Sequence, residues 1–146
     1  MTIHELARRA KKINLTDIGR EIIIDHKNDI VDKNRNQLVN EGVNKLGGRL
    51  KQYRSLAYAK YKNRLNPVVG FGYADFYLHG TYQESLKLNI LNKNTFEIKP
   101  PSSDKATFLL KRDPEHLGLT DESKQEISKE FMQAELVQGV KKILFG

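Results

Sequence analysis

The chain has 146 residues, of which 38% are hydrophobic and 29% are charged. This length suits a single domain over residues 1–146, and the low apolar content predicts a small core, elongated helices, or faces that become covered only in an assembly. It contains no cysteine, which excludes disulfides, thiolate metal sites and cysteine nucleophiles. Its formal net charge is +7, which favours partners that carry negative charge.

No segment has the pattern of a membrane span or of a signal peptide. The longest mostly apolar run, PVVGFGYA at 67–74, is far shorter than the roughly 20 residues that a spanning helix needs. The opening MTIHELARRAKK lacks the apolar stretch of a signal peptide. We therefore expect a soluble chain that is not secreted and has no membrane partner.

The first half of the chain is expected to be helical. Thr2 and Glu5 have the spacing of a capping box, which predicts a short basic helix or arm over residues 1–14. Apolar residues then recur at helical spacing and predict one long helix within 17–50. The glycine pair at 47–48 is expected to end or bend that helix.

The second half is expected to change from helix to sheet. Residues 51–74 form a basic, tyrosine-rich connection, which contains a short helix or an ordered loop at 53–66. Within 75–111, apolar and polar residues alternate on both sides of the turn NKN, and this alternation predicts an antiparallel hairpin. The segment KATFLLK at 105–111 is predicted to add a third strand.

The last helix has the clearest sequence signals. Thr120 is a good N-cap, acidic residues follow it in the first turn, and two lysines lie in the last turn. We expect this helix to cover residues 120–145 and to pack on the sheet. The predicted fold class is therefore α+β, with long N-terminal helices, a small antiparallel sheet of a hairpin plus a third strand, and a C-terminal helix.

The stretch DFYLHGTYQESLKLNIL at 75–91 places a histidine, a carboxylate and a serine close together. However, no glycine-flanked nucleophile elbow surrounds Ser85, and the members of a catalytic triad are normally brought together by the fold. We therefore expect no catalytic site at His79 and Ser85. Gly80 is interpreted as a structural hinge between an aromatic segment and a strand, because glycine tolerates backbone angles that a side chain forbids.

Metal and cofactor sites are not expected either. The four histidines never occur as a close pair with ligand spacing. Glu21, Asp25 and Asp29 recur every four residues, but they have no Glu-x-x-His partner, so a solvated or interface face is the better interpretation. The glycines of GFGYA lack the third glycine and the lysine of phosphate-binding loops.

The positive charge is concentrated in one part of the chain. Residues 42–74 contain no aspartate or glutamate, yet basic residues and tyrosines accumulate there. Lysine and arginine neutralise phosphates and tyrosine stacks on bases, whereas basic faces equally meet acidic protein partners, and tyrosines also anchor loops to a core. The candidate interface or DNA-facing residues are Arg49, Lys51, Tyr53, Arg54, Tyr58, Lys60, Tyr61, Lys62 and Arg64.

Three segments between Tyr58 and Phe131 resemble a known family when they are read in order: YAKYKNRLNP, DFYLHGTYQESLKLNI and HLGLTDESKQEISKEF. They resemble the tailed-phage virion-morphogenesis or tail-completion proteins, the minor-tail group that acts at the head–tail neck. Gly80 and Ser85 match the family's motif Leu-x-x-Thr-Gly-x-Phe-x-x-Ser. Three residues depart from that motif: Phe76, His79 and Tyr82.

The last segment matches the family through Leu-Gly-Leu at 117–119, with Thr120 in place of serine. Gly118, at the centre of this match, is expected to be a second structural hinge. The basic helix expected at residues 1–13 lies outside the resemblance.

The resemblance implies an α+β subunit without enzymatic activity, a virion protein that is present in the host cytoplasm during assembly. The subunit would form a closed homo-oligomeric ring, six-fold or twelve-fold, between the portal or adaptor and the tail. Its partners would be other phage neck, portal, adaptor or tail proteins, with non-specific contact to DNA in the channel. The residues leave one alternative open, a small basic nucleic-acid-binding protein that uses residues 45–64.

Overall fold

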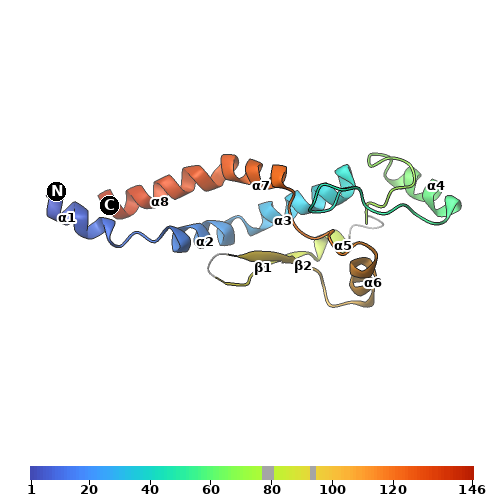
Figure 1. Cartoon of the computed structure of the whole chain (residues 1–146), viewed down its shortest axis with the longest axis horizontal. Coiled ribbons are helices and arrows are strands. Elements are labelled where there is room, and N and C mark those ends of the chain that lie inside the picture. The colour runs from blue at the N-terminus through green and yellow to red at the C-terminus, as the bar shows by residue number, and fades with distance from the viewer. Residues whose placement is uncertain (77–80, 93–94) are drawn as a thin grey trace.

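The chain forms an elongated molecule of helices and one two-stranded antiparallel sheet (Figure 1). This computed structural model describes residues 1–76, 81–92 and 95–146. The two termini lie together at one end of the molecule, and α4 (Leu56–Leu65) lies at the other end. The mixture of helices and sheet agrees with the expected α+β class.

The N-terminal capping box is confirmed. Helix α1 covers Ile3–Ala10. The Glu5 carboxylate accepts the backbone N–H of Thr2 at 2.8 Å, and the Thr2 hydroxyl accepts the backbone N–H of Glu5 at 3.2 Å. These two bonds satisfy donors that the first turn of a helix otherwise leaves free.

The single long helix that we expected after α1 is instead several short pieces. Helix α2 ends immediately before His26 and α3 begins immediately after it, because His26 leaves helical geometry (φ −103°, ψ 17°). A wide π-type turn continues α3 and ends at Gly42, which is earlier than the glycine pair expected to end the helix. The bounds are Leu15–Asp25 for α2, Lys27–Asn36 for α3 and Gln37–Glu41 for the turn.

Gly42 ends this helical stretch for a packing reason. Its φ of +64° is left-handed, and a Cβ at this position would lie 2.9 Å from Cβ of Val69. A residue with a side chain would therefore be strained there and would also meet the loop that follows α4. The apolar periodicity that continues beyond Gly42 does not reveal this contact.

The predicted hairpin is confirmed. Strands β1 (Lys87–Ile90) and β2 (Phe96–Lys99) pair antiparallel, with Leu88 opposite Ile98. The one-turn helix α5 (Thr81–Glu84) precedes β1, and the hairpin packs against α3.

The predicted third strand is wrong, because its residues form helix α6 (Asp104–Arg112). The Ser103 hydroxyl caps the helix by accepting the backbone N–H of Ala106 at 3.1 Å. Ala106 and Leu109, three positions apart, are the buried residues of the helix. Within the described residues the sheet therefore has two strands.

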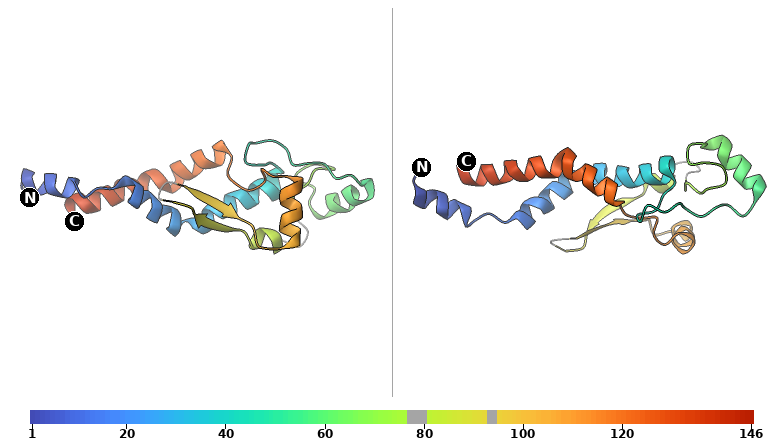
Figure 2. Two further views of the ribbon diagram at one scale, coloured as in Figure 1. Left: turned by 60° about the horizontal axis from the view of Figure 1, so that its bottom comes forward. Right: turned by 45° about the horizontal axis from the view of Figure 1, so that its top comes forward.

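The C-terminal helix begins as predicted but packs elsewhere. The Thr120 hydroxyl accepts the backbone N–H of Ser123 at 3.2 Å, and the helix runs through α7 (Asp121–Ile127) and a π-type turn into α8 (Gln133–Phe145). We expected this helix on the sheet, but α8 packs along α2 and α1, as both views of Figure 2 show. We refer to α1, α2 and α8 together as the helical arm.

The hydrophobic core lies in the middle of the molecule and leaves most of the helical arm outside it. Ile30 and Leu38 of the α3 region and Leu50 of the following loop are almost completely buried. In the arm, by contrast, α1 and α8 contain no buried residue, and Ile22 is the buried residue of α2. The apolar stripes of the arm are therefore only half covered within one chain.

Candidate functional site

A groove lies between the connection that precedes α4 and helix α6, and it contains several of the residues that the charge pattern singled out. Its volume is about 510 Å³, and an adjoining hollow of about 230 Å³ extends it past Lys105. We call this site the basic-aromatic groove. It is lined by Lys51, Gln52, Tyr53, Arg54, Ser55, Tyr58, Phe108, Lys111 and Arg112.

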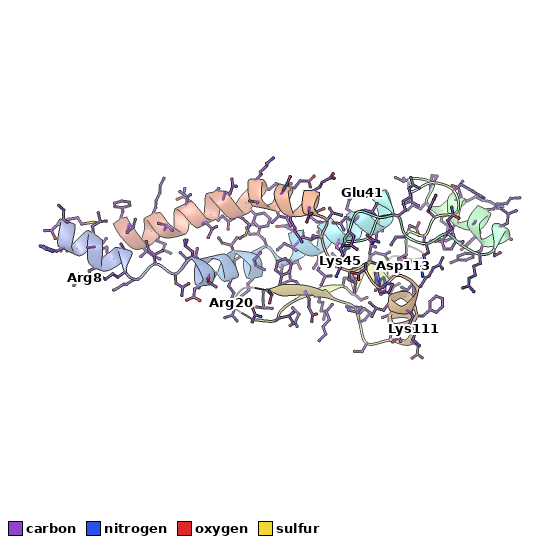
Figure 3. The ribbon with its side chains drawn as sticks, viewed as in Figure 1. Arg8, Arg20, Glu41, Lys45, Lys111 and Asp113 are labelled. Carbon is purple, nitrogen blue, oxygen red and sulfur yellow. The ribbon has the colours of Figure 1, made fainter. Side chains whose placement is uncertain are left out.

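Polar contacts hold the two walls of the groove together. The Arg112 guanidinium donates to the backbone oxygen of Gln52 at 3.0 Å and lies over the Tyr53 ring, 5.1 Å from its centroid. The buried Asp113 accepts the backbone N–H of Lys51 at 3.3 Å. The C-terminal end of α6, where Figure 3 labels Lys111 and Asp113, is therefore fixed against the connection.

The aromatic residues of the groove differ in their exposure. Tyr53 points inward, its hydroxyl lies 3.4 Å from the Asp75 carboxylate, and burial together with that carboxylate raises the pKa of Tyr53. The Tyr58 ring meets the Tyr53 ring edge-to-face, with centroids 5.0 Å apart. Tyr58 is 42% exposed and Phe108 is 61% exposed, so both present ring surface to a ligand.

The positive charge of the groove is not neutralised inside the described part of the chain. Lys33, on α3, forms ion pairs with Glu126 at 2.7 Å and with Glu130 at 3.0 Å. Lys62, which lines the adjoining hollow, is paired with the buried Asp75. The other cations have no carboxylate partner among the described residues, and no aspartate or glutamate lines the walls. Arg112 is engaged by the Gln52 carbonyl, and the four remaining cations without a carboxylate partner are Lys51, Arg54, Lys105 and Lys111.

The structure separates the nine candidate interface residues into four groups, of which the last is the buried Lys62. Those that line the groove are Lys51, Tyr53, Arg54 and Tyr58. Arg49 lies elsewhere, since its guanidinium is 4.3 Å from the centre of the Tyr73 ring and donates to the Val69 carbonyl at 3.1 Å. Three further residues are exposed on α4 outside the groove: Lys60, Tyr61 and Arg64.

Lys62 belongs to the interior and not to the exposed surface on which we expected it. Its ammonium lies 2.8 Å from the Asp75 carboxylate, and the two side chains are only 5% and 2% exposed. Asn66 donates to the same carboxylate at 2.9 Å and to the Val39 carbonyl at 2.6 Å. Lys62 therefore links α4 to the core and is unavailable to a partner.

Helix α6 supplies the part of the groove that sequence reasoning missed. Its contribution went unrecognised because these residues were expected in a strand, where neighbouring side chains point to opposite faces. In a helix, Lys105, Phe108 and Lys111 fall three residues apart and share one face. The signal that identifies this arrangement is the Ser103-Asp104 pair, a typical helix start.

One of the two expected hinges lies in a tightly held loop. Gly118 has φ +130°, and a Cβ there would lie 3.0 Å from Cδ of Lys45. The backbone N–H of Gly118 donates to Asn34 at 3.2 Å, and its carbonyl accepts from Gln37 at 3.0 Å. Gly118 thus occupies a fixed turn, whereas the other expected hinge, Gly80, lies outside the described residues.

Ser85, the serine of the stretch 75–91, makes a local structural hydrogen bond. His79 lies outside the described residues, and the Ser85 hydroxyl donates to the Tyr82 carbonyl at 2.7 Å. Among the described residues, no group of three or more candidate ligands is placed to hold a metal ion. In the same part of the chain, no helix has the length and apolar character to cross a membrane.

Buried His116 belongs to a closed network and not to an exposed reaction site. Its ring nitrogens lie 2.6 Å from the Tyr82 hydroxyl and 2.6 Å from the Asp113 carbonyl oxygen. Burial lowers the pKa of His116 and raises the pKa of Tyr82 to about 12. At neutral pH the imidazole is therefore neutral, with one nitrogen donating to the carbonyl and the other accepting from the phenol.

The resemblance to phage neck proteins rests on the three sequence segments quoted above. No family model, curated protein or solved structure matches this chain.

Proposed function

We propose that this chain is a structural protein of a tailed-phage virion, a neck or tail-completion subunit that forms a ring between the portal or adaptor and the tail. The observation that carries the proposal is the half-covered helical arm. A subunit that is completed by its neighbours is expected to leave apolar helix faces open when it is alone. The sequence resemblance supplies the class of assembly.

The helical arm exposes apolar side chains from three helices at one end of the molecule. Ile3 of α1 is 84% exposed and Phe145 of α8 is 63% exposed, and Leu15 of α2 and Val137 of α8 are exposed as well. Because α1 and α8 contain no buried residue, packing inside one chain gives this arm little hydrophobic stabilisation. A neighbouring subunit that covers the arm would provide it.

The opposite end of the molecule also exposes apolar residues. They come from α4 and from the loop that follows it: Leu56, Leu65, Val68 and Phe71. The N- and C-terminal end and the α4 end are far apart (Figure 1). Two different apolar surfaces on one chain suit a heterologous contact between copies, which produces a ring when its rotation closes.

Mass photometry of the purified protein over a range of concentrations tests this proposal. We expect a discrete ring in the wild type, and we expect Val137→Ser with Phe145→Ser to shift the population to monomers. Lys87→Ser with Lys99→Ser changes two exposed cations of the β1–β2 hairpin, outside both apolar surfaces, and is the matched control. A protein that stays monomeric at every concentration, and that is absent from purified virions by mass spectrometry, would contradict the proposal.

A further inference from the structure

We infer that the basic-aromatic groove binds a single-stranded nucleic acid, with phosphates against its lysines and arginines and bases stacked on Tyr58 and Phe108. The inference does not depend on the assembly role proposed above. It also differs from a purely electrostatic lining by residues 45–64, because one wall of the groove comes from α6.

The charge of the groove indicates an anionic ligand that enters between two walls. Lys51 and Arg54 stand on the wall of the connection, and Lys105 and Lys111 stand on α6. None of the four has a carboxylate partner among the described residues. Asp113, which lies behind these walls, is buried and is engaged by the Lys51 backbone. Four cations that face one groove raise the local concentration of phosphate groups.

The aromatic rings indicate that the ligand also carries flat apolar groups. Phe108 is the most exposed aromatic residue of the groove, and Lys111 and Arg112 of the same helix line the groove with it. The Tyr58 ring is supported at its edge by Tyr53 and lies 6.0 Å from the Tyr61 ring. Aromatic platforms next to backbone-binding cations are the arrangement by which proteins bind single strands without sequence preference.

A single strand fits this combination better than a duplex or an acidic peptide. The bases of a duplex are stacked on one another, so a duplex would contact the cations and leave Tyr58 and Phe108 unused. An acidic peptide carries the charge but lacks a planar ring in every unit. Only a single strand provides a phosphate and an accessible base in each repeat, and its salt dependence is set by the number of phosphates contacted.

Fluorescence anisotropy with the full chain and a labelled oligothymidylate of about 12 nucleotides tests the inference. We expect tighter binding of the single strand than of a duplex of the same length or of an oligoglutamate peptide. Phe108→Ala should weaken binding by about 5- to 150-fold, the range measured for the loss of one stacked base. Lys111→Ala should lower the slope of log affinity against log salt by about 0.7.

The matched controls lie in the β1–β2 hairpin, outside both the groove and the helical arm. Leu91→Ala removes an apolar side chain of similar exposure to Phe108, and Lys99→Ala removes an exposed cation. Neither should change binding by more than about twofold. Because Phe108 and Tyr58 are solvent-exposed, their alanine variants should keep the wild-type circular dichroism.

Three results would overturn the inference. They are no binding at low salt, equal or tighter binding of the duplex or the peptide, and wild-type affinity of both Phe108→Ala and Tyr58→Ala for the single strand. Ring formation is measured in a separate experiment, by mass photometry without nucleic acid. A ring-forming protein that does not bind oligothymidylate would refute this inference alone. A monomer that binds it and is absent from purified virions would refute only the proposed assembly.

Discussion

Gly139 of α8 lies directly against Ile18 of α2, so closely that a Cβ on Gly139 would be 2.8 Å from Cγ2 of Ile18. The approach brings the backbones of the two helices together beside the core, against which Ile18 packs. Cγ2 branches from the Ile18 Cβ, and in a helix such a side chain has one strongly preferred χ1 rotamer. Gly139 is therefore the position that sets the spacing between α2 and α8 in the helical arm.

We expect Gly139→Val to separate these helices and to lower the free energy of unfolding by about 1–3 kcal/mol, as overpacking typically does. Gly19→Ala is the matched control, because Gly19 lies in α2 with nothing within 4 Å of the added methyl group. It should raise stability by about 0.5–1 kcal/mol through helix propensity. Urea unfolding curves followed by circular dichroism measure the stability of both variants. If both changed the free energy of unfolding in the same direction, the close contact between Gly139 and Ile18 would be contradicted.

A second prediction concerns the buried Lys62–Asp75 pair. Lys62→Met leaves the Asp75 carboxylate in the interior without its countercharge, and we expect a loss of about 3–5 kcal/mol in unfolding free energy. Lys60→Met, two residues earlier on α4 and exposed, should change stability by less than about 0.5 kcal/mol. Thermal or urea denaturation distinguishes the two outcomes. If Lys62→Met were as mild as Lys60→Met, Lys62 would have to be on the surface.

The sequence patterns that predicted structure correctly are those in which the interacting residues lie close together in the chain. Thr2 and Glu5 interact within a single turn, Thr120 caps the helix that it precedes, and Leu88 faces Ile98 across a short hairpin. Each of these interactions joins residues that are at most ten positions apart. Such signals do not require knowledge of how distant segments pack.

The features that sequence reasoning missed depend on distant contacts or on short ambiguous runs. A short, mostly apolar run such as TFLL in α6 does not by itself distinguish a strand from a buried helix. The break at His26 depends on Glu135 and Phe131, which are more than one hundred residues away. The wall formed by residues 51–58 could be predicted from the acid-free stretch. The sequence does not distinguish the buried Lys62 from its exposed neighbours, because its contact with Asp75 depends on the fold.

A third prediction concerns Gly118, whose φ of +130° is accessible almost only to glycine. Gly118→Ala adds backbone strain and a contact with the Lys45 side chain, and we expect a loss of about 1–3 kcal/mol. Gly47→Ala provides the comparison, because Gly47 also has a positive φ (+82°) but nothing within 4 Å of an added methyl group. Gly118→Ala should be the more destabilising variant in urea unfolding. If Gly47→Ala were the more destabilising variant, the turn at Gly118 that Asn34 and Gln37 hold by hydrogen bonds would have to adapt to a side chain.

His26 connects the break between α2 and α3 to α8. Its Nε2 lies 2.6 Å from the Glu135 carboxylate, its Nδ1 lies 3.0 Å from the Asp29 carboxylate, and its ring stacks on Phe131 with centroids 3.9 Å apart. The hydrogen bonds to Asp29 and Glu135 raise the pKa of His26 above its ordinary value of 6.5. The imidazolium form is therefore the one that holds the two segments together.

The last prediction is a pH dependence that this cluster imposes on stability. Because the folded-state pKa of His26 is raised, its stabilising contribution is complete below the unfolded value of 6.5 and is lost as pH rises through the folded value. Buried His116 has a lowered pKa, so its contribution has the opposite sign and weakens as pH falls below 6.5. The variant His26→Gln leaves His116 in place and removes only the first effect.

We expect the stability difference between wild type and His26→Gln to be largest near about pH 6 and to shrink as the pH rises past the folded pKa of His26. The lost stacking on Phe131 adds an offset that does not depend on pH, so the change with pH is the quantity that reports the ion pairs. Urea midpoints measured from about pH 5.5 to 8.5 give this difference directly. Glu135→Gln should reduce the same pH dependence without removing the ring. Parallel curves for wild type and His26→Gln would show that His26 is not held as an imidazolium by Asp29 and Glu135.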